Sequence, residues 1–186
     1  MKSRPASAKP APPRFSRITV LQGEARVSAD PDAEFGTVLG SCVATCLFDP
    51  VARIGGMNHF LLPEPPASHD RAKVDVHYGT YLMEILINQM LGQGARKERL
   101  RAHLYGGANL RAGMAPIGTS NAEFARAFLE REGIPLMRSD LGGASARRVD
   151  FRPVSGQVRC RIVENRLAPD SLPAPVVRPR GDVELF

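Results

Sequence analysis

A candidate nucleophile in this sequence is a cysteine, Cys42, in the segment VLGSCVATCLFDP at residues 38–50. Gly40 and Ser41 precede it, and such small neighbours leave a nucleophile open to an approaching substrate. A turn at these residues would also aim backbone N–H groups at a developing oxyanion. Because a free thiol is mostly protonated at neutral pH, a nucleophilic cysteine needs an activating partner.

His59 is the candidate partner for Cys42. It lies 17 residues further along the chain, beyond an Asp-Pro and a Gly-Gly that predict a hairpin turn within residues 49–56. Neighbouring antiparallel strands bring side chains on one face to about 5 Å from each other. This spacing therefore allows the imidazole of His59 to take the thiol proton as a general base.

Two other interpretations of Cys42 remain open from these residues alone. A cysteine in an apolar strand is commonly a core residue, and a histidine among apolar residues is commonly structural. A zinc site would use Cys42, Cys46 and His59, but the Cys-x3-Cys spacing lacks a second pair of ligands. We expect core positions for Cys46 and for the third cysteine, Cys160.

Three other histidines compete for the role of base. We expect His69 to lie in a solvated loop, His77 to open a helix and His103 to face outward from a strand. Gly106 and Gly107 follow that last strand. Such a glycine pair either shapes a substrate cleft or forms a simple turn.

The elements that must position these residues are short strands and two helices. Apolar and β-branched patterns predict strands within residues 17–21, 25–29, 42–50, 55–63, 100–105, 134–141, 146–151 and 157–163. Helices are predicted over 79–94 and 120–133. Ser120 and Glu123 fit the spacing of a capping box, and Gly133 ends the second helix. Strands before and after two helices indicate an α+β domain built of layers.

The composition indicates one domain between two tails. A chain of 186 residues can bury one proper core. We expect a basic, Pro/Ala-rich, solvated tail at residues 1–15, a folded domain at 16–167 and a Pro-rich tail at 168–186. The net charge is +6, but five of the positive charges precede Ile18, so the body is nearly neutral and does not suggest a nucleic-acid groove.

Other features of the composition point to the cytoplasm. The sequence has no apolar stretch of the roughly 18 residues that a membrane helix needs, and its start lacks the apolar part of a secretory signal. Three cysteines are a small and odd number for a disulfide framework. They fit a reducing compartment, where a reactive thiol stays reduced.

Six segments of the sequence together resemble one family, the chemoreceptor glutamine deamidases known as CheD. They occur in the family's order within residues 18–163. They are LGSCVATCLFDP, GGMNHFLLP, YGTYLMEILINQML, LYGGANL, IGTSNAEFARAFLEREGI and DLGGASARRVDF. Such an ordered set is far more specific than a Cys–His pair alone.

The resemblance implies a cytoplasmic cysteine amidohydrolase that needs no metal and no organic cofactor. Its nucleophile falls on Cys42 and its base on His59. The implied fold is a three-layer α+β sandwich, two β-sheets with helices packed on one side, as in the catalytic domain of cytotoxic necrotizing factors. We expect substrate contacts from nearby residues: Gly40, Ser41, Asn58, Gly106 and Gly107.

The implied substrates are glutamine side chains on cytoplasmic helices of methyl-accepting chemotaxis proteins, which become glutamate. The resemblance also implies a second possible partner, a CheC-type phosphatase, and methylesterase activity is attributed to some family members. It implies no nucleic-acid partner and no direct insertion into the membrane.

One position departs from the family pattern. The family orients its histidine with a threonine shortly before the cysteine, at the position that aligns best with Gly36 here. We assign this role to the next residue, Thr37, with a backbone carbonyl or water as the alternative. Gly36 also motivates a second functional hypothesis, a weakly active or non-catalytic regulator that docks on receptors or on the phosphatase. Deamidation of a protein other than a receptor is a third.

Overall fold

The structure of the chain is a computed structural model that describes residues 15–62, 76–110 and 116–163. The predicted tails, apart from Phe15, and the predicted loop residue His69 lie outside the described residues. In chain order the elements are β1 (Ser16–Thr19), β2 (Glu24–Ser28), β3 (Ala33–Leu39), β4 (Val43–Asp49), β5 (Ile54–Phe60), α1 (Val76–Gly92), η2 (Lys97–Arg99), β6 (Arg101–Gly106), α2 (Ile117–Arg131), β7 (Leu136–Leu141), β8 (Ala146–Arg152) and β9 (Gln157–Val163).

The strands form two mixed sheets. The outer sheet has the order β1-β3-β8-β9, and the central sheet has the order β2-β5-β4-β6-β7. Most neighbouring strands are antiparallel, while β1 runs parallel to β3 and β6 runs parallel to β7. The predicted hairpin is present, because β4 and β5 pair in antiparallel register with a tight turn at residues 50–53.

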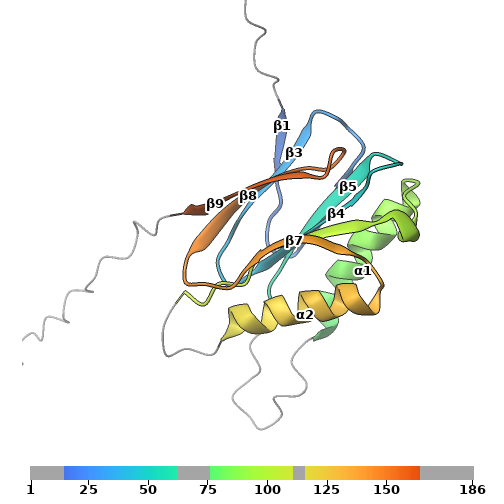
Figure 1. Cartoon of the computed structure of the whole chain (residues 1–186). Coiled ribbons are helices and arrows are strands. Elements are labelled where there is room, and N and C mark those ends of the chain that lie inside the picture. The colour runs from blue at the N-terminus through green and yellow to red at the C-terminus, as the bar shows by residue number, and fades with distance from the viewer. Residues whose placement is uncertain (1–14, 63–75, 111–115, 164–186) are drawn as a thin grey trace, which may run out of the picture.

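The two sheets and the two helices form three layers. Figure 1 shows the outer sheet on one side of the central sheet and both helices on the other. Helix α1 packs on β2 and β5, and α2 packs on β4, β6 and β7. One buried apolar cluster lies between the sheets and a second lies between the central sheet and the helices. The predicted three-layer α+β arrangement is confirmed.

Strand β4 is buried on both of its faces, so its alternate residues enter different cores. Val43 and Leu47 belong to the cluster beneath the helices, whereas Ala44 and Cys46 belong to the cluster between the sheets. This alternation is the ordinary consequence of a pleated strand in a central sheet. It also decides which neighbours of Cys42 share its side of the sheet.

Both helices end as predicted, but the start of α2 differs. Gly94 and Gly133 each adopt a positive φ just after a helix, and the following N–H bonds back five residues, which closes a Schellman motif. Helix α2 begins at Ile117 after Pro116 and has no side-chain cap. The predicted capping box is therefore wrong: Ser120 lies inside the helix and its hydroxyl donates to the Pro116 carbonyl.

Candidate active site

Cys42 lies at the end of a loop whose carbonyl groups are held by hydrogen bonds. The loop, residues 40–42, leads directly into β4, and the cysteine is half-buried. Its three carbonyl groups accept hydrogen bonds from the Ala108 N–H at 2.9 Å, the Asn121 side chain at 2.9 Å and the Gly107 N–H at 2.8 Å. These three hydrogen bonds hold the backbone of the loop in place.

His59 lies on the strand next to Cys42 and on the same face. In the β4–β5 ladder His59 is directly opposite Ala44. Cys42 precedes Ala44 by two residues and packs against the same cluster between the sheets. If the ladder is extended by one residue pair, Cys42 lies diagonal to His59, a relation in which side chains are typically about 7–8 Å apart. His59 lies on a strand as expected, whereas Cys42 lies in the loop just before β4.

The imidazole of His59 is held from the outer sheet. The Thr37 hydroxyl oxygen lies 2.9 Å from His59 Nδ1 and donates its proton to the Val20 carbonyl at 2.9 Å. Nδ1 also lies 3.3 Å from that carbonyl. The hydroxyl has one proton, which the carbonyl accepts, so the remaining bond requires a hydrogen on Nδ1. This network fixes the tautomer in which Nε2 carries a lone pair.

Nε2 of His59 is buried and has no hydrogen-bond partner among the described residues. Burial lowers the pKa of the His59 imidazole below the ordinary value of 6.5, and the hydrogen bond to Val20 opposes this only in part. Burial also raises the pKa of the Cys42 thiol, against a smaller effect of its own backbone N–H. Both shifts favour a neutral thiol and a neutral imidazole at rest.

The thiol of Cys42 faces Gln22 in this structure. Sγ lies 3.5 Å from Gln22 Oε1 and is the donor. Within the part of the chain that the structure describes, no hydrogen bond joins Cys42 to His59. Sequence reasoning missed Gln22, because a loop residue 20 positions before the cysteine carries no local signal.

Gly36 and Thr37 point to opposite sides of β3. A Cβ atom on Gly36 would lie 3.4 Å from Asp150 Oδ1, on the outer face of the outer sheet. Thr37 is buried and faces the central sheet. Because side chains alternate along a strand, only one of two neighbouring residues can reach His59, and here it is Thr37. The absence of a side chain at residue 36 leaves this contact untouched.

The predicted substrate contacts lie in three different environments. Gly40 and Ser41 flank the thiol and are partly exposed. Gly106 and Gly107 are buried behind the loop, and a Cβ on Gly106 would lie 2.1 Å from the Cys42 carbonyl oxygen. Both glycines have a positive φ, and Gly106 packs closely against the backbone of the cysteine loop. They therefore support this loop and do not line a substrate cleft.

The expected substrate role of Asn58 does not fit its position. Its side chain is fully buried on the helix-facing side of the central sheet, opposite to His59. It accepts from the Thr45 N–H at 2.9 Å and donates to the Leu82 carbonyl at 3.3 Å. Asn58 therefore joins β4, β5 and α1, and it cannot touch a substrate at Cys42.

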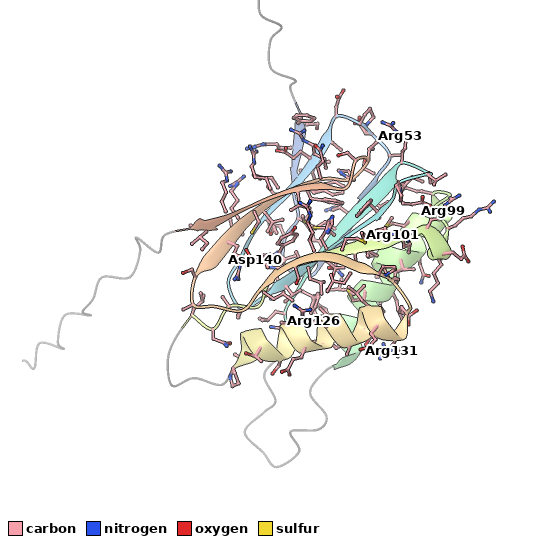
Figure 2. All side chains as sticks on the ribbon, viewed as in Figure 1. Arg53, Arg99, Arg101, Arg126, Arg131 and Asp140 are labelled. Atoms are coloured by element: carbon pink, nitrogen blue, oxygen red, sulfur yellow. The ribbon has the colours of Figure 1, made fainter. Side chains whose placement is uncertain are left out.

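The remaining histidines and cysteines lie elsewhere in the structure. The prediction that His103 faces outward is wrong, because its ring is buried against Phe48 and Nε2 lies 3.2 Å from the Gly156 carbonyl. Cys46 is fully buried between the sheets, as predicted. Cys160 packs at the edge of that core and lies 3.5 Å from Asp140, which Figure 2 labels on β7. His77 belongs to α1, but its side chain is outside the described residues.

Asn121 is a second residue that sequence reasoning missed. It is fully buried on α2, where its amide donates to the Ser41 carbonyl and its oxygen accepts from the Leu62 N–H at 2.8 Å. The residue thus links the helix layer to the cysteine loop and to the end of β5. The available signal was a polar residue inside the apolar stripe of a helix.

One cavity of the described residues lies apart from this arrangement. A cavity of about 540 Å³ is lined by residues such as His103, Asp150 and Arg159, but by none of Thr37, Cys42 or His59. The described residues contain no cluster of three potential metal ligands among His, Cys, Asp and Glu. They also include no helix long and apolar enough to cross a membrane.

The family model and the similar proteins found by comparison all concern one family. The family model described as CheD chemotactic sensory transduction matches residues 61–162. A protein of Zymomonas mobilis named probable chemoreceptor glutamine deamidase CheD is 55% identical over 92% of this chain and 93% of its own length. Proteins with the same name from Caulobacter vibrioides and Agrobacterium fabrum are 50% and 44% identical, over 94% and 91% of this chain and 96% of their own lengths.

Among solved structures, the hypothetical protein YfiH of Bacillus licheniformis matches at a TM-score of 0.41 and 14% identity. That match covers 64% of this chain and 49% of the other. The similarity is too low to support an argument about function.

Proposed function

The chain belongs to the CheD family of chemotactic sensory transduction proteins, and from that membership we propose that it hydrolyses glutamine side chains of chemoreceptors to glutamate with Cys42 as the nucleophile. The observation that carries this proposal is the hydrogen bond between Thr37 and His59, 2.9 Å long. It leaves the lone pair of Nε2 free on the face of the sheet that also presents Cys42.

The first step is attack by sulfur on the amide carbon. The substrate amide lies against the thiol, and His59 Nε2 takes the thiol proton as the new carbon–sulfur bond forms. The proton moves during attack because both groups are neutral at rest. Nδ1–H remains bonded to the Thr37 hydroxyl, so the ring that becomes positively charged is already oriented.

The loop before Cys42 supports the charge that develops on the substrate oxygen. The carbonyl groups of residues 40–42 all accept hydrogen bonds, from Ala108, Asn121 and Gly107. With the backbone of the loop fixed in this way, we assign the N–H of Cys42 as the backbone donor to the oxyanion.

The second half of the reaction releases two products. Nε2–H gives its proton to the leaving nitrogen, ammonia departs and a thioester remains on Cys42. A water molecule then loses a proton to Nε2 and attacks the thioester. The carbon–sulfur bond breaks, the thiol is restored and the substrate leaves as glutamate. Every proton passes through Nε2.

The surroundings of Cys42 favour a protein segment as the substrate. Leu21, Tyr78 and Leu110 are large apolar residues with 60%, 36% and 47% of their surface exposed. Leu21 belongs to the turn that carries Gln22, and Tyr78 contacts that turn at Gly23. Leu110 lies against Gly40. An apolar rim around a polar reaction centre suits an amphipathic helix that carries a glutamine.

The alternative of a non-catalytic docking regulator was motivated by Gly36. The contact of Thr37 with His59 argues against it, since the glycine faces away from the site. Binding of a CheC-type phosphatase and a cytoplasmic location remain part of the proposal and are compatible with it.

The proposal is tested by incubating the protein with the cytoplasmic fragment of a chemoreceptor and reading its glutamines by mass spectrometry. Wild-type protein should convert selected glutamines to glutamate, and Cys42→Ala should convert none. Cys160→Ala is the matched control, because it removes another half-buried thiol, on β9 of the outer sheet, and it should keep full activity. Conversion by Cys42→Ala at the wild-type rate would reject the proposal.

A further inference from the structure

Gln22 places a carboxamide against the reacting sulfur. Its Oε1 accepts from the Cys42 thiol at 3.5 Å, although the residue comes from the turn between β1 and β2. Nothing in the catalytic steps above uses this side chain. A primary amide beside a nucleophile offers both an acceptor oxygen and two N–H donors.

The turn that carries Gln22 is fixed on three sides. The N–H of the next residue, Gly23, donates to the His59 carbonyl at 2.8 Å. Leu21 and Glu24 close the turn by a backbone bond of 3.0 Å and a side-chain bond of 3.1 Å. Gly23 has a φ of 86°, and a Cβ atom there would lie 2.5 Å from the Tyr78 hydroxyl. Gln22 is exposed, but its backbone is tied to the strand of the base.

The resting contact must break when the reaction starts. Once Nε2 has taken the thiol proton, the sulfur has no hydrogen to give, and the Gln22 oxygen loses its donor. Rotation about the last side-chain bond then brings the amide N–H₂ of Gln22 toward the attacked carbon. A negative oxygen is forming there, and it needs donors from the side that the backbone N–H of Cys42 does not occupy.

We propose that Gln22 is a catalytic residue of this chain, the side-chain donor of an oxyanion hole whose backbone donor is the N–H of Cys42. The inference rests on the proposed function and adds one residue to it. In the resting protein the same carboxamide holds the thiol protonated and in place. During attack its N–H₂ group stabilises the tetrahedral intermediate.

The test compares Gln22→Leu and Gln22→Glu with wild-type protein on the receptor fragment. Leucine removes the donor at similar size, and glutamate replaces it with an oxygen that repels the oxyanion. Each should lower kcat by roughly 100- to 1000-fold with little change in KM, the cost of one lost oxyanion donor. Gln93→Leu, a change at an exposed glutamine after α1, is the matched control and should not change kcat.

A second readout separates catalysis from structure. Alkylation of Cys42 by iodoacetamide forms no oxyanion, so Gln22→Leu should keep an alkylation rate within about threefold of wild type. An equal loss of alkylation and deamidation would overturn the inference, since Gln22 would then act through the thiol alone. So would conversion of Gln22 itself to glutamate in wild-type but not Cys42→Ala protein, since the residue would then be a substrate.

Failure of this inference can be distinguished from failure of the proposed function. If wild-type protein converts receptor glutamines and Gln22→Leu does so at a similar kcat, only the role of Gln22 is rejected. If wild-type protein converts none while Cys42 still alkylates, the deamidase function fails and the role of Gln22 fails with it. Equal melting temperatures of the variants and wild type establish that folding is not the cause.

Discussion

At His59, one hydroxyl group selects the reactive ring nitrogen. The Thr37 hydroxyl gives its proton to Val20, which leaves the ring to donate from Nδ1 and keeps Nε2 free to accept. A hydroxyl is a neutral partner, so it orients the ring without stabilising the imidazolium as strongly as a carboxylate does. The proposed triad of Cys42, His59 and Thr37 therefore depends more on geometry than on charge.

Replacing the hydroxyl at residue 37 should slow catalysis without unfolding the protein. In Thr37→Val the ring keeps its contact with the Val20 carbonyl but loses its fixed direction. We expect kcat to fall by roughly 10- to 100-fold, less than a lost triad carboxylate costs, as measured on the receptor fragment. Thr37→Ser should keep most of the activity. Gly36→Thr should have little effect, and a large gain from it would show that residue 36 is the orienting position.

The acid side of the pH profile should lie below that of an ordinary histidine. The proposed mechanism needs neutral His59, and burial lowers the pKa of this group below 6.5. Protonation therefore occurs at a lower pH, so the acid limb of kcat/KM should be centred below 6.5. A profile of kcat/KM against pH measures this directly. An acid limb centred above 6.5 would contradict the neutral resting pair.

At the scale of single residues, the sequence predicts what is local and misses what is distant. The hairpin turn and its spacing were sufficient to pair Cys42 with His59. It was harder to predict which face of the sheet a side chain occupies, because a shift of one residue moves the side chain to the opposite face. This explains the misassignment of Asn58 and the question over Gly36. Gln22 comes from another turn, and no spacing rule connects it to the cysteine.

At the scale of elements, apolar patterns located most strands and both helix ends. Central strands such as β4 and β5 have apolar residues on both faces, which makes them visible as continuous runs. Strand β3 is missing from the predicted strands, since polar and small residues interrupt its apolar pattern. The start of α2 was placed late, because Ser120 offered a familiar capping pattern three residues inside the actual helix.

Asn121 should matter for both stability and rate because it ties α2 to the cysteine loop. Asn121→Ala leaves the Ser41 carbonyl and the Leu62 N–H without their partner. We expect unfolding in urea to become easier by about 1–3 kcal/mol, and kcat to fall as the loop loosens. Ser120→Ala, its exposed neighbour, should change the free energy of unfolding by less than about 0.5 kcal/mol. Equal effects of both variants would reject this assignment.

At the scale of the whole molecule, the candidate site joins two layers. His59 belongs to the central sheet and Thr37 to the outer sheet, so the spacing between the sheets sets the 2.9 Å bond between the hydroxyl and the ring. Figure 1 shows these sheets stacked face to face. Their stacking order could not be predicted from the sequence, because β3 pairs with β1 in parallel and with the distant β8.

Two matched core substitutions can test whether the sheet spacing controls the rate. Phe35 is a residue of β3 and lies between the two sheets. Phe128 is a residue of α2 and lies between that helix and the central sheet. Each is 1% exposed. Phe35→Leu and Phe128→Leu should each cost about 1–2 kcal/mol of unfolding free energy. Only Phe35→Leu should lower kcat, because Thr37 is on the same face two residues later. A similar kcat loss in Phe128→Leu would show that the rate follows stability in general.

The most direct test of the central claim is to trap the thioester on Cys42. Hydroxylamine added to the reaction with a receptor fragment should divert the intermediate to a hydroxamate, which mass spectrometry detects at individual glutamines. The account predicts hydroxamate at the same positions that become glutamate in its absence, and none with Cys42→Ala. Glutamate formation without any hydroxamate, or hydroxamate formation by Cys42→Ala, would contradict covalent catalysis by this cysteine.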